Sequence, residues 1–115
     1  MTQRELSEFL NDILKSLGAI ERLSAGLSLA EFAEAEDEQL LILKNIEIIG
    51  EAVKSIPQEI REQYAQIPWK QIVGMRDRLV HQYWNVDVEL VWDTMQTDLP
   101  LLKAVITQIR EDYGS

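Results

Sequence analysis

The apolar residues of the N-terminal segment recur at spacings of three and four. From Arg4 onward this pattern continues for about five turns and includes Leu6, Phe9, Leu10, Ile13, Leu14, Leu17 and Ile20. It is the period of an amphipathic helix, and Gly26 predicts where that helix stops. Ser28 then precedes the acidic stretch LAEFAEAE, which indicates either a short helical turn or a solvated connection.

The most apolar segment of the chain is residues 38–56. One line of the expected helix carries Ile42, Ile46, Ile49, Val53 and Ile56, with Leu41, Ile48 and Ala52 beside it. So wide an apolar arc predicts burial against more than one neighbour, such as a bundle core together with a second subunit. Asn45 lies inside the arc, where its amide needs hydrogen-bond partners. It either satisfies a backbone kink near Gly50 or braces the side chains of residues 72–87 across the core.

Two prolines divide the middle of the chain. Pro57 suits the first turn of a helical segment over residues 58–65. Pro68 does the same for a second helix that begins at Trp69. We expect this second helix to loosen by Asn85, because Asn85, Val86 and Asp87 have turn chemistry.

The remaining residues predict two more helices. Asp87 can cap the first, with Glu89 favourable in its first turn, and this explains the pair better than metal binding does. Pro100 lacks the N–H that a helix interior requires, so the chain should kink or restart between Thr97 and Pro100, with Asp98 as a candidate cap. The last helix carries Leu102, Val105, Ile106 and Ile109. Strand patterns are absent, so residues 1–115 should form one all-α domain, an antiparallel bundle of about four to five helices.

Composition limits the chemistry of such a domain. The chain of 115 residues has no cysteine and a single histidine, His81, which excludes disulfides, thiolate nucleophiles and histidine-rich metal centres. We therefore expect no metal and no other cofactor. The sequence has neither an apolar run of transmembrane length nor a signal-like start, which predicts a cytoplasmic protein that does not bind membranes.

Charge is distributed unevenly along the chain. The net charge of −9 argues against general polynucleotide binding, so DNA is not an expected partner. Residues 1–62 have six basic and thirteen acidic residues, a net −7, and residues 87–115 have two and six, a net −4. Residues 63–86 have three basic residues and one acidic residue, a net +2. This basic island suits a small anion or an RNA bound at one cleft.

The island also holds the candidate catalytic residues. On a helix drawn at about 100° per residue, Arg76 falls within an apolar arc, where an unpaired charge would cost several kcal/mol. Arg76 therefore needs an acid, a carbonyl or an incoming phosphate. His81 can move a proton near neutral pH, although a lone histidine near a helix end can also simply cap or pack. Asp77 is either a solvated charge or an acid that orients Arg76 or His81.

Helix geometry restricts how these residues can act together. Arg76 and Tyr83 are seven residues apart and share a face, but His81 lies about 140° around an ideal helix from Arg76. One straight helix cannot direct both at one phosphate. Either the helix unwinds at His81, or two subunits bring their motifs together. The wide apolar arc of residues 44–56 favours a homodimer.

The motif R-x4-H-x-Y, formed by Arg76, His81 and Tyr83, resembles the signature of the HepT-like toxins of the HEPN superfamily. The similarity extends through three segments: KNIEIIGEAVKSI (44–56), IPWKQIVGMRDRLVHQYWNVD (67–87) and VWDTMQTDLPLLK (91–103). These segments follow the family's order and spacing and cover most of the chain. Trp69, Gly74 and Asp87 beside the motif make the match more specific than the motif alone.

The resemblance implies an HEPN-like dimer that acts as the toxin of a type II HepT/MntA system. Its partner would be an MNT-domain nucleotidyltransferase antitoxin of the MntA type. Arg76 and His81 would cleave RNA without metal, the ribose 2′-hydroxyl attacking the adjacent phosphate and leaving a cyclic phosphate end. Asp77 and Asn45 would support them. Tyr83 would accept AMP from the antitoxin, which would switch the nuclease off.

A second class of function stays open. The alternative is a non-catalytic HEPN subunit that binds a nucleotide or docks a nucleotidyltransferase, with Arg76 and His81 holding the anion. The acidic composition favours this alternative. The intact set of Arg76, His81 and Tyr83 favours the ribonuclease, which we adopt as the working prediction.

Overall fold

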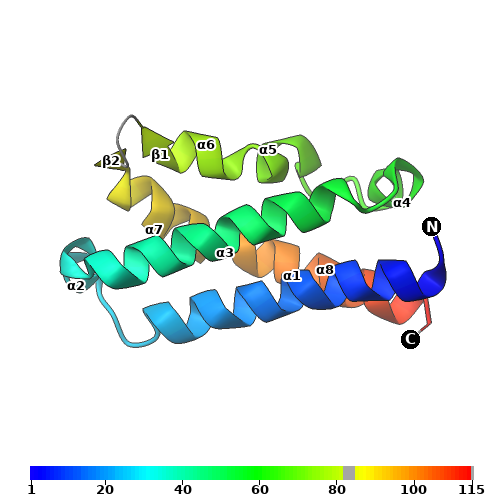
Figure 1. The fold of residues 1–115 in the computed structure, drawn as a ribbon, viewed down its shortest axis with the longest axis horizontal. Coiled ribbons are helices and arrows are strands. Elements are labelled where there is room, and N and C mark those ends of the chain that lie inside the picture. Colours follow the sequence, from blue (N-terminus) through cyan, green and yellow to red (C-terminus); the bar gives the residue numbers. More distant parts are fainter. Residues whose placement is uncertain (82–84, 115) are drawn as a thin grey trace.

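The computed structural model describes residues 1–81 and 85–114, and of His81 only the backbone. Two long helices, α1 (Gln3–Ser24) and α3 (Glu36–Lys54), run antiparallel along the long axis (Figure 1). The C-terminal helix α8 (Asp98–Asp112) packs against α1, and α7 (Val88–Gln96) packs against α8. The molecule measures 42 × 28 × 22 Å. The prediction of an all-α helical bundle is confirmed.

Both ends of α1 follow from local sequence. The Thr2 hydroxyl accepts a hydrogen bond from the backbone N–H of Glu5 at 3.1 Å, and the Glu5 carboxylate accepts one from the backbone N–H of Thr2 at 3.3 Å. This reciprocal capping box satisfies N–H groups that the helix itself leaves unpaired. Gly26 has φ of 76°, a left-handed conformation that favours glycine, and it confirms the predicted stop.

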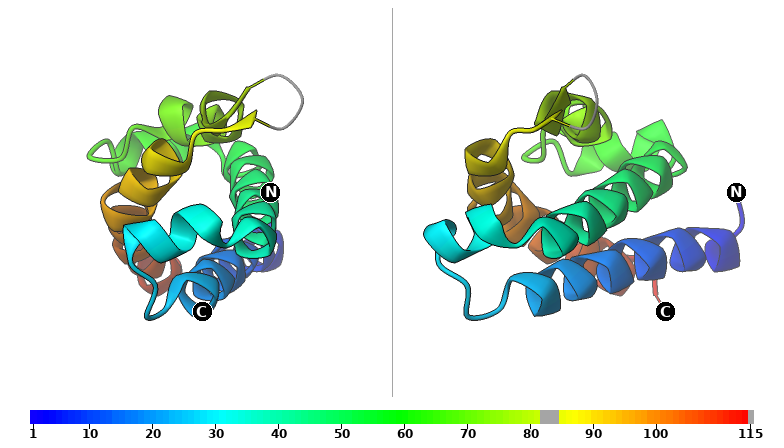
Figure 2. Two further views of the ribbon diagram at one scale, coloured as in Figure 1. Left: turned by 90° about the vertical axis from the view of Figure 1, so that its left-hand side faces the viewer. Right: turned by 60° about the vertical axis from the view of Figure 1, so that its left-hand side comes forward.

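The acidic stretch after α1 forms a short helix, α2 (Leu29–Glu34), rather than a loop. Ser28 and Glu31 make a second capping box, which the spacing of the two residues in the sequence could have revealed. Phe32 is fully buried and packs against Trp92 of α7, with ring centroids 5.7 Å apart. As a result α2 lies across one end of the bundle, in contact with α3 and α7 (Figure 2).

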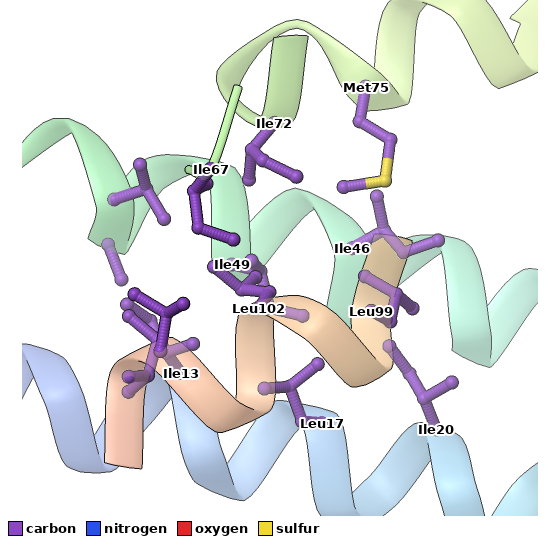
Figure 3. Packing of buried hydrophobic residues seen from close by; sticks show 14 of the residues in the cluster. Ile13, Leu17, Ile20, Ile46, Ile49, Ile67, Ile72, Met75, Leu99 and Leu102 are labelled. Atoms are coloured by element: carbon purple, nitrogen blue, oxygen red, sulfur yellow. The ribbon is translucent and has the colours of Figure 1, made fainter. Parts of the chain in front are cut away.

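The core is formed mainly by α1, α3 and α8, and side chains from the segment after α3 complete it. Figure 3 labels Ile13, Leu17 and Ile20 of α1, Ile46 and Ile49 of α3, Leu99 and Leu102 of α8, and Ile67, Ile72 and Met75 from residues 67–75. The predicted line of isoleucine and valine on residues 42–56 is buried throughout. Leu41 and Ile48 beside that line remain 52% and 38% exposed, so the apolar arc of α3 is wider than the core that it covers.

The segment expected to be one motif helix is divided. After α4 (Gln58–Gln63), the chain forms α5 (Trp69–Val73) and α6 (Met75–Leu79), which lie along α3 (Figure 1). Pro57 and Pro68 precede α4 and α5 as predicted. The prediction that the helix continues toward Asn85 is wrong. Gly74, a poor helix former, separates α5 from α6, and the β-branched Val80 is extended.

A small hairpin follows α6. Strand β1 (Val80–His81) pairs antiparallel with β2 (Asn85–Val86), Val80 opposite Val86 and His81 opposite Asn85. The sequence predicted no strand here, because two residues are too few to show a period of two and their stability depends on a partner across the ladder.

The caps of the last two helices show one success and one error. The Asp87 carboxylate accepts a hydrogen bond from the backbone N–H of Leu90 at 3.1 Å, which confirms Asp87 as the N-cap of α7. The chain restarts after Gln96 as predicted. However, Thr97 rather than Asp98 occupies the N-cap of α8. In the described part of the chain, no helix combines the length and the apolarity that crossing a membrane requires.

Candidate active site

Arg76 lies at the rim of the helical face that packs on the core, not inside that face. Its side chain is 32% exposed, whereas the neighbouring Met75 is fully buried. Ile72, Met75 and Leu79 have the three-and-four spacing of the buried stripe, so the stripe is centred one residue away from Arg76. The predicted buried guanidinium is therefore half-buried, and its desolvation costs less than the sequence implied.

Arg76 lines a hollow between α3 and α6 that we call the Arg76 hollow. Its other lining residues are Leu40, Leu43, Lys44 and Glu47 of α3, and its volume is about 470 Å³. Most of its wall is apolar, and Arg76, Lys44 and Glu47 are the charged residues of its lining. Such a site suits an anionic group attached to a flat or apolar body, as in a nucleotide.

Sequence reasoning missed the part that Lys44 and Glu47 play in this hollow. They were part of the ordinary polar stripe of a helix, and Lys44 Nζ lies 3.9 Å from Glu47 Oε2, a spacing common on helix surfaces. Their position opposite Arg76 depends on how α6 packs on α3. No signal within residues 38–56 carries that information.

The predicted supporting residues differ in their positions. The Asp77 carboxylate lies 3.5 Å from Arg76 Nη1, but its side chain is 86% exposed. Asp77 is therefore a solvated charge that also lies beside the Arg76 guanidinium. An exposed ion pair of this kind contributes about 0–1 kcal/mol, so an incoming phosphate can replace it. Asn45 lies elsewhere on α3, where its half-buried amide donates to the Leu41 carbonyl at 2.8 Å.

The end of α6 at Leu79 changes the geometry around His81. Because the helix stops before His81, the angle of about 140° that separates the two residues on an ideal helix no longer applies. This is the first of the two alternatives, an unwound helix. The side chain of His81 and all of Tyr83 lie outside the described residues. The convergence of His81 on Arg76 and the role of Tyr83 stay predictions.

Besides the buried side chains, a hydrogen-bonded indole and a close backbone approach position α5. The buried Trp69 indole donates from Nε1 to the carbonyls of Arg61 at 2.9 Å and Tyr64 at 3.1 Å. The two carbonyls also accept backbone N–H groups, from Tyr64 at 3.1 Å and from Ile67 at 3.3 Å, so the indole joins α5 to the turn that ends α4. On α3, a Cβ at Gly50 would meet the Val73 carbonyl oxygen at 3.3 Å, so glycine permits this close approach.

Comparison with known proteins covers the whole of this region. The sequence model of the family described as "Ribonuclease HepT-like" matches residues 13–109. "Putative RNase MJ1216" of Methanocaldococcus jannaschii is 38% identical over 112 residues, 97% of this chain and 93% of the relative. "Probable ribonuclease HepT" of Thermococcus cleftensis is 33% identical over 109 residues, 95% of this chain and 99% of the relative.

A bacterial relative shows similar agreement. "Putative RNase TTE0752" of Caldanaerobacter subterraneus is 35% identical over 101 residues, 88% of this chain and 90% of the relative. No solved structure matches this chain significantly. The matched ranges place the Arg76 hollow and the hairpin inside the shared sequence.

Proposed function

The chain belongs to the HepT-like ribonuclease family, and from this premise we propose that it is a metal-independent endoribonuclease toxin that acts through Arg76 and His81. One observation carries the proposal. The half-exposed guanidinium of Arg76 forms the wall of a largely apolar hollow, and the chain turns out of its helix four residues later, just before His81. Relatives named as ribonucleases support RNA as the substrate.

Arg76 would bind and stabilise the phosphate. A guanidinium offers two parallel N–H donors that match two non-bridging phosphate oxygens, and the charge on these oxygens grows in the crowded transition state. Leu40 and Leu43 line the same hollow, and an RNA bound over them would displace water near the guanidinium and so strengthen the electrostatic interaction.

His81 would transfer the proton. The ribose 2′-oxygen attacks phosphorus and gives its proton to the imidazole, while the bond from phosphorus to the 5′-oxygen breaks and that oxygen takes a proton from the imidazolium. The products are a 2′,3′-cyclic phosphate and a 5′-hydroxyl. An imidazole with an ordinary pKa of about 6.5 can act as base and acid at neutral pH without any metal.

The test compares three single variants of the folded protein. We expect His81→Ala and Arg76→Ala to reduce RNA cleavage by about a hundredfold or more, because each removes a group that acts on the reacting atoms. Arg78→Ala is the matched control. It removes an arginine of the same helix, whose Nη2 donates to the Gln71 carbonyl at 3.1 Å, and should retain activity. Cleavage should persist in excess chelator.

Two outcomes would count against this function. Undiminished cleavage by folded His81→Ala would remove the catalytic assignment, and activity lost with chelator would remove the metal-free mechanism. A pure wild-type protein that binds nucleotides but cleaves no RNA would favour the alternative, a non-catalytic subunit that docks a nucleotidyltransferase.

We further propose that the active form is a homodimer and that an MNT-domain nucleotidyltransferase of the MntA type is its antitoxin. The exposed Leu41 and Ile48 of α3 support the dimer, because large apolar side chains on one helix face favour a partner surface. The motif resemblance supports the antitoxin. We place the active toxin in the cytoplasm, where RNA is available.

The antitoxin would control the toxin by transferring AMP to Tyr83. A phosphodiester there adds about one negative charge two residues from His81, and it would compete with RNA phosphate for the guanidinium of Arg76. The test is intact mass after co-expression with the cognate nucleotidyltransferase. We expect added adenylyl units on the wild type and on Tyr113→Phe but none on Tyr83→Phe. Adenylyl units that persist on Tyr83→Phe would assign the modification to another residue.

A further inference from the structure

The Arg76 hollow is one end of a longer groove. A second hollow of about 300 Å³ shares Glu47 and Arg76 with it and is also lined by Gly50, Lys54 and Val73. A third, of about 560 Å³, shares Lys54 and Val73 with the second. The shared residues make the three hollows continuous along the line where α5 and α6 lie beside α3 (Figure 1). We call this line the α3–α5 groove.

The two ends of the groove differ in their balance of acidic and basic side chains. Near Arg76 each acid has a cation beside it: Glu47 and Lys44 at 3.9 Å, Glu51 and Lys54 at 3.2 Å, and Asp77 and Arg76 at 3.5 Å. The third hollow is lined by three basic side chains, Lys54, Arg61 and Lys70, and by one acidic side chain, Glu62. In a chain of net charge −9, this far end of the groove attracts anions.

Lys70 is the cation best placed to hold an anion there. The Arg61 guanidinium is engaged in the fold, since its Nε donates to the Ile56 carbonyl at 3.0 Å, and Lys54 Nζ lies 3.2 Å from Glu51. Lys70 is exposed at the start of α5. The two hydrogen bonds of the neighbouring Trp69 hold the start of α5 in place, and with it the backbone of Lys70.

Lys70 and Arg76 lie at the two ends of the groove. Lys70 is in the first turn of α5, and Arg76 is in the first turn of α6, beyond the break at Gly74. One RNA strand along the groove would therefore meet the two cations with two different phosphates.

We propose that the far end of the α3–α5 groove, with Lys70 as its principal cation, binds a second phosphate of the same RNA strand whose phosphate at Arg76 is cleaved. The inference rests on the proposed function for the identity of the ligand. Continuity with the Arg76 hollow favours a single RNA strand over a separate acidic protein, because one chain can then occupy both ends. The partly exposed Val73 in the lining of the far end offers apolar contact to a base.

The first experiment compares a dinucleotide with octanucleotides that extend on either side of the cleaved bond. We expect Lys70→Glu to raise KM on an octanucleotide by about tenfold with kcat unchanged, and to leave dinucleotide cleavage unaffected, because a dinucleotide cannot reach Lys70. Lys15→Glu is the matched control. It makes the same change of charge at an exposed lysine of α1, outside the groove.

The second experiment measures binding without cleavage. A 2′-deoxy octanucleotide lacks the attacking hydroxyl, so its affinity reports the groove even if the protein cleaves no RNA. The slope of log K against log salt should become shallower by about 0.7 in Lys70→Ala, the loss of one single-strand phosphate contact, and should not change in Lys15→Ala.

These measurements separate the two proposals. If the wild-type protein cleaved no RNA but Lys70→Glu still weakened its binding of the octanucleotide, the nuclease would be rejected and the groove retained. Normal cleavage with equal KM in Lys70→Glu and Lys15→Glu would reject the groove and retain the nuclease. If Lys70→Glu bound RNA normally but lost affinity for a protein partner, the third hollow would be a protein-docking site, and the inference would be overturned.

Discussion

One pair of side chains joins the middle of the chain to its C-terminal helix. Tyr64, which follows α4 and is almost fully buried, donates from its hydroxyl to the Asp112 carboxylate at 2.5 Å. Burial, reinforced by that carboxylate, raises the pKa of Tyr64 to about 12. The Tyr64 hydrogen bond, followed by one from Gln108, lowers the pKa of Asp112. The pair holds the C-terminal end of α8 against Tyr64, which precedes α5 in the chain.

This pair predicts a stability that falls at alkaline pH. Because the folded pKa of Tyr64 lies above its ordinary value of about 10, its contribution is complete below pH 10 and disappears as pH rises toward 12. Tyr64→Phe should lose about 1 kcal/mol at pH 7 and show a smaller decline between pH 10 and 12. Urea unfolding across that range measures both effects.

The matched control for Tyr64 is Tyr113→Phe, which removes a hydroxyl that donates to Gln63 at 3.0 Å on the surface. We expect its alkaline profile to follow the wild type. At the acid end, Asp112 has a lowered pKa, so its contribution is present above its ordinary value and is lost as pH falls below it. Parallel profiles for Tyr64→Phe and Tyr113→Phe would show that the bond does not matter for stability.

At the scale of elements, the helices with clear periodicity and caps were predictable, while the hairpin was not. Thr2, Ser28 and Asp87 act within three or four residues of themselves, so the sequence contains their whole effect. The break at Gly74 and the strand pair after Leu79 depend on contacts with α3 and across the hairpin. These tertiary contacts override the helical pattern at residues 80–81.

The crossing of α3 and α5 gives a prediction at this scale. Gly50→Ala would place a Cβ 3.3 Å from the Val73 carbonyl oxygen, a backbone atom that cannot rotate away, so α5 must shift by a few tenths of an ångström. Crowding costs about 1–3 kcal/mol, which outweighs the gain of up to about 1 kcal/mol from alanine in a helix. Val73 precedes Arg76 by three residues, so a shift of α5 also displaces Arg76. We therefore expect the cleavage rate of Gly50→Ala to fall even under conditions where the variant stays fully folded.

The control for Gly50→Ala is Gly18→Ala in the middle of α1. Its Cβ would meet only the flexible end of Arg22 at 3.4 Å, so helix propensity should prevail and the variant should be stabilised. Urea midpoints and cleavage rates of both variants decide the matter. Equal stabilisation of Gly50→Ala and Gly18→Ala would mean that the approach of α5 to α3 is looser than the geometry indicates.

At the scale of the whole molecule, the surplus apolar surface of α3 predicts self-association. We expect light scattering to give about twice the chain mass of 13.3 kDa. Leu41→Glu places a charge on that surface and should yield a monomer with weaker RNA cleavage. Leu101→Glu is the control, since Leu101 of α8 is 46% exposed, close to the 52% of Leu41. A fully active monomer at all concentrations would contradict the dimer.

The sequence by itself determined the helical class, most helix ends, the buried line of α3 and the motif with Arg76 and His81. All of these depend on residues within a few positions of one another, through helix period and hydrogen bonds at the caps. The tertiary structure alone decided that Met75 rather than Arg76 is buried, that the helix ends before His81, and that Lys44, Glu47 and Lys70 border one groove. These features arise because α5 and α6 pack against α3, which ends at Lys54, well before α5 begins at Trp69, and no local pattern contains the energy of that packing.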